Sequence, residues 1–582
     1  MQEEAILPFG LNKTKRYVSE GGERQLFVSH RVGESGSVEL VDYMGGDATV
    51  ERVATAGHGR GIFREQPTQE DFLRYLIANG IYEPFKSVHV KASIQSPILA
   101  ALAFVYDGRV NTNEHSGRYS EMIRSFLVPS VEQIASLLSG EIGGVARNER
   151  AGNIRDLILE KRGKIRDGYN ELLDMDMARE LARIGLGVDN DTRYFWKIDL
   201  HSLADFVGRQ RKLHGGEGPV IPYIEKIAEI ARAVAPLSWD VLTSDNPIKK
   251  DKMRLIMPRD EEIVDGNLSP SNWGPNNTRR VTVGALEELL FVPRDVLDHG
   301  QIQPVDYMGD DNSMAQAART SYGEGTKSLQ DNANLVRSLI RDRHTSPTEM
   351  AEEALEIKTP VFIAPRQWGR HRTLDNHGFM GYTPVGSQFY FPPKSEFKYQ
   401  DRKNRQGRGK DMDEEDYVKA SGILRESFDS ELKLVGKLRE EGVDEGIIRQ
   451  IKGVGFYTKR WTTGDIHNWG HFLGLRLDLS AQKEIRVYAE AVEEFVRAQT
   501  PVTAGAFRTY GIDGMRLSTV EIDTLKSLLE GRINIDAESL ETYKGRGWVI
   551  PVDRDDPLKG KKLSREGEAF QNKLRRILGR EE

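Results

Sequence analysis

Apolar residues recur at helical spacing late in the chain, where positions three or four apart carry Ile485, Tyr488, Val492 and Phe495. This spacing puts the four side chains on one face, so it predicts an amphipathic helix that packs on a core. The proline at position 501 follows the pattern and predicts where the helix ends. A similar apolar face occurs over residues 71–78, and the pair Asn79-Gly80 marks its end.

The pattern of elements occurs twice along the chain. Residues 41–45 read Val-Asp-Tyr-Met-Gly and recur at 305–309, an offset of 305 − 41 = 264 positions. In each copy a helical pattern follows, the second one near residues 334–340, and then an apolar, strand-like segment that begins with Pro97 or Pro360. Because order and spacing hold over roughly 150 residues, the sequence predicts a tandem duplication.

The duplication divides the chain into four predicted parts. A first repeat covers residues 1–244 and a second covers 296–514. Between them, residues 245–295 read as a linker, because they hold turn-forming Asn-Pro, Ser-Pro and Gly-Pro pairs and little periodicity. The tail, residues 515–582, reads helix, strand, charged turn and helix, which suits a small winged-helix-like module. From Arg516 onward it has 14 basic and 13 acidic residues, so it lacks the basic footprint of a nucleic-acid-binding module.

Composition narrows the class of protein. A chain of 582 residues is too long for one hydrophobic core, and its 38% hydrophobic and 29% charged residues are typical of soluble globular proteins. No apolar run approaches the roughly 20 residues of a membrane helix, and no secretory signal is seen at the start. The absence of cysteine fits a cytoplasmic protein and excludes a thiolate nucleophile or metal ligand. His467 and His471 share a helix face near Asp465, but no glutamate lies between them and no further histidine is close in sequence, so we expect no metal site.

Three short motifs carry candidate chemistry. In the first, residues 114–118 read Glu-His-Ser-Gly-Arg and place a hydroxyl, a bare backbone amide and a guanidinium within three positions. Such a set can surround a phosphate, because Arg118 can make two charge-assisted hydrogen bonds and Gly117 permits close backbone approach. The alternative is a surface turn with a salt-bridged arginine.

The second motif is Arg370-His371-Arg372. In an extended segment its two guanidinium groups point to one side, which suits an anionic cofactor or substrate. The alternative is a solvated basic patch. The apolar neighbours Ile363, Ala364 and Trp368 argue against it, because they indicate partial burial.

The third motif runs from Leu475 to Ile485, at the start of the periodic helix described above. Arg476 in this motif is a candidate for polarising a carbonyl group. Alternatively, Arg476 and Asp478 pair and cap the helix.

Together with the repeat, these motifs resemble a flavin-dependent thymidylate synthase (ThyX) duplicated in tandem. The resemblance implies an α+β fold of two thymidylate synthase-complementing-protein-like cores. It implies conversion of dUMP to dTMP with FAD as cofactor and with 5,10-methylenetetrahydrofolate and NADPH as co-substrates. It also implies dUMP contacts by Glu114, Ser116, Gly117, Arg118, Gln367, Arg370, Arg449 and Arg476. The flavin and folate contacts that it implies are His344, Ser346, Glu349, Arg370, His371, Arg372 and Arg476, and the catalytic residues are Arg476, Ser116 and Arg370.

Each copy lacks what the other retains. The first has Ile81 and Gln210 where the second has His344 and Arg476, and the second lacks the nucleotide loop of the first. In the family, active sites form between subunits of a homotetramer, so the resemblance implies sites composed from both repeats and a homodimer that mimics the tetramer.

Three positions depart from the family pattern. Gly455 and Asp465 replace asparagines that contact the flavin, and Ser480 replaces a histidine. Two alternatives therefore remain: a catalytically inert nucleotide-binding or assembly homologue, and a related transferase that acts on another pyrimidine nucleotide.

Overall fold

The computed structural model describes most of both predicted repeats and short pieces of the tail. The described residues are 12–55, 68–105, 109–115, 120–138, 144–244, 277–319, 329–364, 368, 374–377, 388–400, 408–443, 453–479, 481–514, 549–551 and 561–563, with isolated helical positions at 519, 522, 568, 571 and 575.

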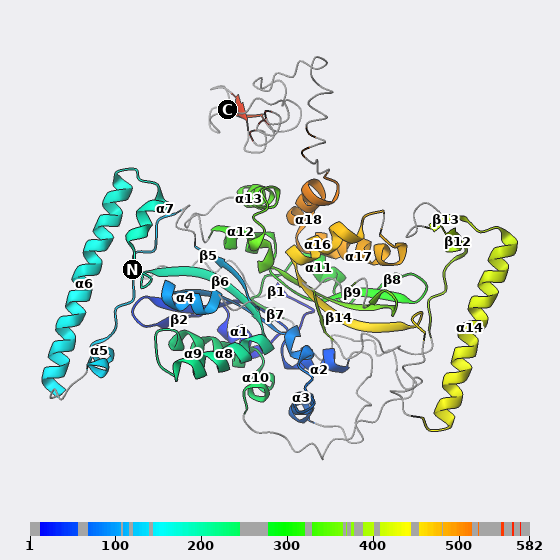
Figure 1. Ribbon diagram of the computed structural model, residues 1–582, viewed down its shortest axis with the longest axis horizontal. Coiled ribbons are helices and arrows are strands. Elements are labelled where there is room, and N and C mark those ends of the chain that lie inside the picture. Colours follow the sequence, from blue (N-terminus) through cyan, green and yellow to red (C-terminus); the bar gives the residue numbers. More distant parts are fainter. Residues whose placement is uncertain are drawn as a thin grey trace.

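Each repeat contains a five-stranded sheet in which all neighbouring strands are antiparallel (Figure 1). The first sheet has the order β2-β3-β4-β6-β5 and the second, read in the same direction, β8-β9-β10-β14-β11. The first set of strands is β2 Ser29–Val32, β3 Gly36–Met44, β4 His89–Pro97, β5 Asn111–Glu114 and β6 Asp191–Asp199. The second set is β8 Arg294–Val296, β9 Gly300–Met308, β10 Glu352–Pro360, β11 Asp375–His377 and β14 Tyr457–Asp465. The shared topology confirms the duplication.

The repeated pentapeptide has the same local structure in both copies. The register between β3 and β4 shifts by one residue between Leu40 and Asp42, and that between β9 and β10 shifts between Pro304 and Asp306. A β-bulge therefore lies at the valine that opens each Val-Asp-Tyr-Met-Gly segment.

Three helices close each repeat on one face of its sheet (Figure 1). They are α8 Leu200–His214, α9 Ile221–Val234 and α10 Pro236–Thr243 in the first repeat, and α16 Ile466–Arg476, α17 Lys483–Gln499 and α18 Pro501–Phe507 in the second. The predicted apolar face of α17 is confirmed, because Ile485, Tyr488, Val492 and Phe495 are all buried.

The remaining helices of the first repeat are α1 Glu20–Gln25, α2 Asp47–Thr55, α3 Gln69–Ala78, η2 Glu83–Ser87, α4 Ile98–Val105, α5 Val131–Leu137, α6 Gly144–Asp174, α7 Arg179–Ala182 and η3 Arg183–Gly185. Those of the second are α11 Gly284–Leu289, α12 Asp311–Arg319, α13 Leu329–Arg341, η7 Ser346–Met350, η9 Lys394–Glu396, α14 Glu414–Glu440 and the π-helical turn η10 Arg508–Ile512, beside the hairpin of β12 Lys398–Gln400 and β13 Arg408–Asp411. The long helices α6 and α14 lie at opposite ends of the molecule (Figure 1). Within the described residues, no helix combines the length and apolarity needed to cross a membrane.

Two predictions need correction. The strand-like segments do not begin at Pro97 and Pro360, because these prolines end β4 and β10, and residues 98–105 form α4. In such a short apolar run, periodicity does not distinguish a strand from a helix. This run is also rich in alanine, a strong helix former. Second, part of the predicted linker is structured, since residues 277–295 hold β7 (Asn277–Thr278), α11 and the start of β8. Residues 245–276 lie outside the described part.

The tail is described only in part. β15 (Val549–Pro551) pairs antiparallel with β16 (Lys561–Leu563), so the predicted strand near residue 550 is present and has a partner strand that was not predicted. The winged-helix arrangement stays a prediction.

The segment that precedes the sheet of each repeat contacts the other repeat. β1 (Asn12–Lys13) pairs antiparallel with β7. The Thr14 hydroxyl donates to Glu287 of the second repeat (2.9 Å), and the Thr278 hydroxyl donates to Glu23 of the first (2.5 Å). Partners in these contacts are equivalent positions, since 278 − 14 and 287 − 23 both equal 264. A local twofold axis therefore relates the repeats.

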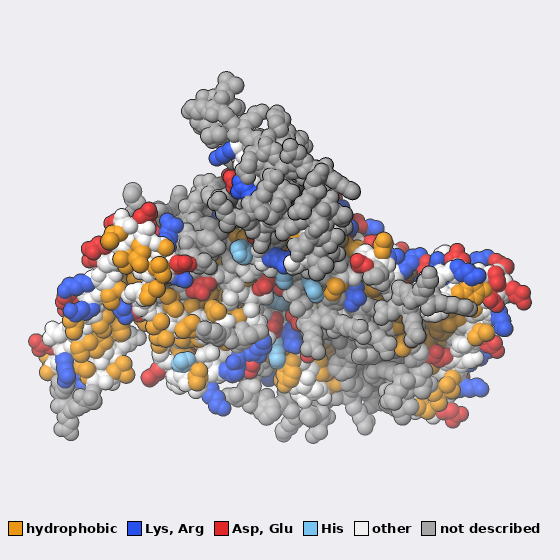
Figure 2. Space-filling view, turned by 45° about the horizontal axis from the view of Figure 1, so that its top comes forward, with side chains coloured by type: hydrophobic (Ala, Val, Ile, Leu, Met, Phe, Trp, Pro, Cys, Tyr) orange, Lys and Arg blue, Asp and Glu red, His pale blue; other side chains and the backbone are white. Residues whose placement is uncertain are grey.

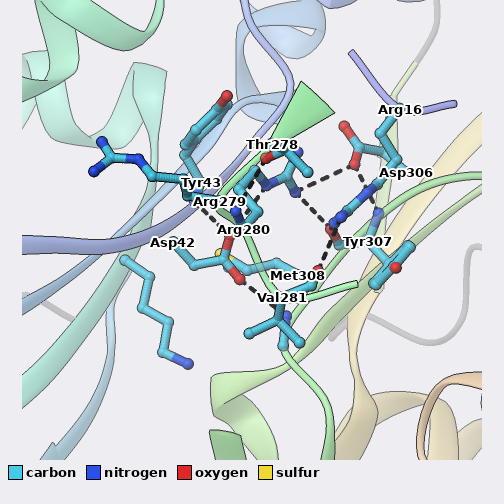
Figure 3. A network of polar contacts seen from close by, with 12 residues as sticks. Arg16, Asp42, Tyr43, Thr278, Arg279, Arg280, Val281, Asp306, Tyr307 and Met308 are labelled. Carbon is cyan, nitrogen blue, oxygen red and sulfur yellow. Dashed lines mark hydrogen bonds and ion pairs between the residues drawn. The ribbon is translucent and has the colours of Figure 1, made fainter. Parts of the chain in front are cut away.

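Buried arginines fill the centre of this interface (Figure 3). The guanidinium carbon of Arg16 lies 3.9 Å from the ring centroid of Tyr307, and that of Arg280 lies 4.6 Å from that of Tyr43. Each arginine precedes the sheet of one repeat and stacks on a tyrosine of the other. The equivalent tyrosines belong to the repeated pentapeptides, which explains why that segment is shared by both copies.

Arg280 also forms ion pairs with one aspartate from each repeat. Its Nε lies 3.1 Å from Asp42 and its Nη2 lies 3.4 Å from Asp306. The second oxygens of these carboxylates accept from the backbone N–H of Gly309 and Gly45, at 3.1 and 3.0 Å, so each aspartate bonds across the axis. Burial alone would lower the pKa of Arg280, but the two carboxylates raise it above its usual value.

We predict that Arg280→Ala lowers the free energy of unfolding by about 3–5 kcal/mol, because it leaves two buried carboxylates without their cation. Urea unfolding followed by tryptophan fluorescence measures the change. The matched control is Arg232→Ala, which removes an exposed pair with Asp240 and should cost less than about 1 kcal/mol. Equal effects of the two variants would contradict the prediction.

Candidate active site

β5 carries the predicted nucleotide loop to the edge of the first sheet. The side chain of Glu114 accepts a hydrogen bond from the Thr192 hydroxyl on β6 (2.8 Å). Beyond it, the ring of His115 bonds to the Glu121 carbonyl (2.9 Å) and lies 3.2 Å from the Ser120 hydroxyl. These bonds bring the two ends of the loop together. Residues 116–119, with Ser116, Gly117 and Arg118, lie outside the described residues.

β5 also contacts the second repeat. The Asn111 amide donates to Oε2 of Glu349 at 3.0 Å, and the Ser346 hydroxyl donates to Oδ1 of Asn113 at 3.3 Å. The Asn113 amide also donates a short hydrogen bond to the carbonyl of Ala317, at the end of α12. The strand that leads into the nucleotide loop is thus bound to the turn that carries Ser346 and Glu349, within a single chain.

The turn η7 is fixed from both sides. Its first residues are held by Thr348, which bonds to the carbonyl of Thr345 through both its backbone N–H and its hydroxyl. At its other end, the buried Lys91 of the first repeat donates to the carbonyl of Met350 at 2.8 Å. Burial lowers the pKa of Lys91 to about 8, partly offset by Asp42. His344, the candidate for folate access, is exposed just before this turn.

Trp368 anchors the segment that holds the arginine motif. Its ring is fully buried and stacks on Phe472 of α16, with centroids 4.6 Å apart, and it meets Trp469 edge-on. Ile363 and Ala364 are also buried, so the expected burial beside the motif is confirmed. Gln367, Arg370, His371 and Arg372 lie outside the described residues, as does Arg449.

Arg476 is the last residue of α16 and is half-buried. The helix α16 packs against η7, so Arg476 belongs to the element beside Ser346 and Glu349. The alternative, in which Arg476 and Asp478 cap the following helix, does not match the N-cap of α17. Its N-cap is Gln482, without a side-chain hydrogen bond.

Equivalent positions of the two copies differ as predicted. Gln210 lies eleventh in α8, as Arg476 does in α16, and Ile81 precedes η2 as His344 precedes η7. The turns themselves differ as well, because Lys86 of η2 is equivalent to Glu349 of η7. Sequence reasoning did not single out Lys86.

Two departures from the family pattern have structural explanations. A Cβ at position 455 would lie 3.0 Å from the ring of Phe428, which stacks on Phe389, so this site favours glycine. Asp465 is the N-cap of α16, where its carboxylate accepts the backbone N–H of Asn468 at 2.8 Å. Ser480 lies outside the described residues.

Comparison with known proteins gives two matches to one family model. The family described as "Thymidylate synthase complementing protein" matches residues 39–237 and again residues 304–502. The chain belongs to this family, as a tandem duplicate. A flavin-dependent thymidylate synthase from Gluconobacter oxydans is 41% identical over 266 residues, which cover 44% of this chain and 86% of that protein. Another from Rickettsia conorii is 41% identical over 270 residues, covering 44% and 92%.

A solved structure is also similar to part of this family member. It is the UMP/dUMP methylase PolB from Streptomyces cacaoi bound with 5-Br UMP, at 27% identity and a TM-score of 0.34, covering 38% of this chain and 99% of that one. The family assignment rests on the sequence matches, which also confirm the predicted resemblance and the predicted duplication.

We predict that Asn111→Asp weakens the contact between the repeats. The change replaces the amide donor with a second carboxylate beside Glu349, so the unfolding free energy should fall by about 1 kcal/mol at pH 8. The loss should be smaller at pH 5, where one of two adjacent carboxylates can take up a proton. Urea unfolding at both pH values measures this. Asn79→Asp, at the exposed end of α3, is the control, and equal losses at both pH values would contradict the prediction.

Proposed function

We propose that this chain is a flavin-dependent thymidylate synthase that converts dUMP to dTMP at a site composed from both repeats. FAD is its cofactor, and 5,10-methylenetetrahydrofolate and NADPH are its co-substrates. The observation that supports a composite site most directly is the contact of Asn111 and Asn113 with Glu349 and Ser346. It joins the strand before the nucleotide loop to the turn beneath the proposed flavin platform. A cytoplasmic location remains a prediction from the cysteine-free composition.

In this proposal the first repeat anchors the nucleotide. Ser116 and Arg118 hold the phosphate together with Arg449, while Gly117 lets the backbone approach and Glu114 contacts the nucleotide. The hydrogen bond from Thr192 to Glu114 fixes the carboxylate at the start of this loop. Gln367, Arg370 and Arg476 of the second repeat approach the uracil from the other side.

The described groups of the second repeat fit a flavin dinucleotide. The Ser346 hydroxyl and the Glu349 carboxylate can bond to ribose and ring N–H groups, and Arg476 supplies positive charge near the ring. His344, His371 and Arg372 complete the proposed flavin and folate contacts. When bound, the reduced cofactor supplies the hydride, and the two arginines Arg370 and Arg476 stabilise negative charge that develops on the pyrimidine. A thiolate is not needed, which agrees with the absence of cysteine.

The equivalent contact on the other side of the axis has different chemistry. There β11 packs on η2, as β5 packs on η7. Where the first contact has the pair Asn111 and Glu349, the second has Asp375 and Lys86, and Lys86 forms an ion pair with Glu83 at 2.8 Å. We therefore propose one competent site in each chain.

A homodimer would restore the four-unit arrangement of the family. The helices α6 and α14 project at the two ends and expose large apolar residues, such as Val145 and Leu157 on α6 and Val418 and Ile423 on α14. Figure 2 shows apolar side chains gathered at the end where α6 lies. Such surfaces favour association with another molecule.

We predict that the purified protein binds FAD, shows the absorbance of oxidised flavin, and forms dTMP from dUMP. Arg476→Gln should lower kcat/KM for dUMP by about 10²–10³, since it removes a charge that stabilises the transition state. Glutamine is the residue that the first repeat has at the equivalent position, 210. Arg211→Gln is the control and should change little. A colourless protein that binds dUMP without turnover would instead indicate the inert homologue, and turnover of another pyrimidine nucleotide would indicate the other transferase.

We also predict that Arg118→Ala and Arg370→Ala chains stay inactive after they are mixed. If both arginines serve one site within each chain, every site in a mixed dimer keeps one defect. If sites form across chains, mixed dimers regain one intact site, and up to about a quarter of wild-type activity returns on statistical grounds. Differently tagged chains, unfolded and refolded together, allow the mixed dimer to be isolated. Recovered activity would contradict the within-chain arrangement.

A further inference from the structure

A cavity of about 190 Å³ lies where strand ends of the two sheets meet, and its lining includes the equivalent pairs His89 and Glu352, Asn111 and Asp375, and Asp199 and Asp465. These pairs open β4 and β10, open β5 and β11, and close β6 and β14. We call it the axial cavity, because residues related by the local twofold axis face each other across it.

Four parts of the proposed active site are adjacent in sequence to residues of the axial cavity. Asn111 opens the strand that leads to the nucleotide loop, and Glu352 follows Glu349 by three positions. Asp375 follows the arginine motif, and Asp465 caps the helix that ends at Arg476. A change of charge or geometry in this cavity therefore acts on every one of these parts.

Two buried carboxylates oppose each other in the cavity wall. Glu352 and Asp465 are direct cross-strand partners on β10 and β14 and are only 3% and 5% exposed. Lys197 of the first repeat is fully buried and forms an ion pair with Glu352. One ammonium group thus faces two carboxylates, and like charges directly opposite each other in a sheet are destabilising.

Among the described residues, Lys197 is the cation whose charge lowers the pKa of Asp465. His89 lies 3.9 Å from Glu352 rather than from Asp465, and Arg109 pairs with Asp205 at 2.7 Å. Three further carboxylates surround the pair. They are Asp199, half-buried as the N-cap of α8, Asp375, which lines the cavity, and Glu349 on η7.

These surroundings favour the neutral form of Asp465. Burial raises its pKa most, Glu352 and Glu349 raise it further, and Lys197 and the bond from Asn468 lower it, with a net value of about 8. Burial alone would lower the pKa of Lys197, but its partner Glu352 raises it above its usual value, which agrees with a lysine that stays charged.

We propose that Asp465 is a positioning residue that stays protonated in the working enzyme and so lets the two repeats close around the axial cavity. As a neutral acid it leaves Lys197 to Glu352 and still caps α16 through Asn468. As an anion it would repel Glu352 and Glu349, the two carboxylates that fix β10 and η7 against the first repeat. This inference rests on the proposed function for its effect on turnover, and not for the protonation itself.

The test compares Asp465→Asn with the wild-type holoenzyme from pH 6 to 9.5. Asparagine is neutral at every pH and also caps helices, so the variant should keep wild-type kcat/KM near pH 7. Above about pH 8 the ratio of variant to wild-type kcat/KM should rise about tenfold per pH unit, as expected for loss of a single proton. A flat ratio, or a variant inactive at every pH, would overturn the proposal. Asp413→Asn, at the exposed N-cap of α14, is the control.

A second measurement needs no turnover. Infrared titration of the wild-type apoprotein should show a protonated carboxyl band, shifted in D2O, that disappears near pH 8 and is missing in Asp465→Asn. The comparison with the variant is needed because burial also raises the pKa of Glu353. Unfolding gives the same information: a carboxyl with a raised folded pKa contributes stability at low pH that is lost as the pH rises from about 4 to 8. Wild-type inactivity with this band present would reject the proposed function alone, and absence of the band would reject the role of Asp465.

Discussion

The structure depends on the buried ionic contacts that join the two repeats at their local axis. Arg280 bridges Asp42 and Asp306, and both aspartates accept a backbone N–H from the opposite repeat. A buried ion pair gives little net stability compared with apolar packing, but it tolerates no other partner, since a misplaced repeat would leave charges unpaired in the interior. These contacts therefore fix the angle between the two sheets, and with it the shape of the axial cavity between the repeats.

Around this symmetric centre the two copies have diverged at positions with chemical roles. The threonine, arginine, tyrosine and aspartate of the interface occur in both repeats, at 14 and 278, 16 and 280, 43 and 307, and 42 and 306. At the ends of β5 and β11 the copies differ: Asn111 bonds to Glu349 on one side, while Asp375 and Lys86 lie on the other. The interface constrains both copies equally, because equivalent residues of the two copies make equivalent contacts with the opposite repeat. If one active site in each chain is sufficient, the equivalent positions on the other side of the axis are not under the same constraint.

The sequence predicted the duplication, the buried face of α17 and the family, because these depend on periodic or contiguous patterns. It did not predict that Ile98–Val105 is helical, since eight apolar residues fit either element. It also missed β7 and α11, whose residues are stabilised by contacts with the other repeat, such as Thr278 with Glu23. The sequence did not predict the axial cavity for the same reason, because its residues come from distant parts of the chain. Lys197 and Glu352, for example, are 155 positions apart. The one available signal was local, namely two consecutive acidic residues, Glu352 and Glu353, at the start of an otherwise apolar segment.

Duplication within one chain permits an arrangement that a homo-oligomer cannot reach. In identical subunits every substitution appears on both sides of each symmetric interface, so a lysine opposite an aspartate in one cleft implies the same pair in its mate. Here Lys197 of β6 is equivalent to Thr463 of β14, and His89 to Glu352, so one cation serves two carboxylates that belong to the same repeat. A lysine at the equivalent position 463 would face the equivalent residues His89 and Asp199, not Glu352 and Asp465. The asymmetry of the axial cavity thus depends on two different copies in one chain, which a symmetric pair of identical subunits cannot supply.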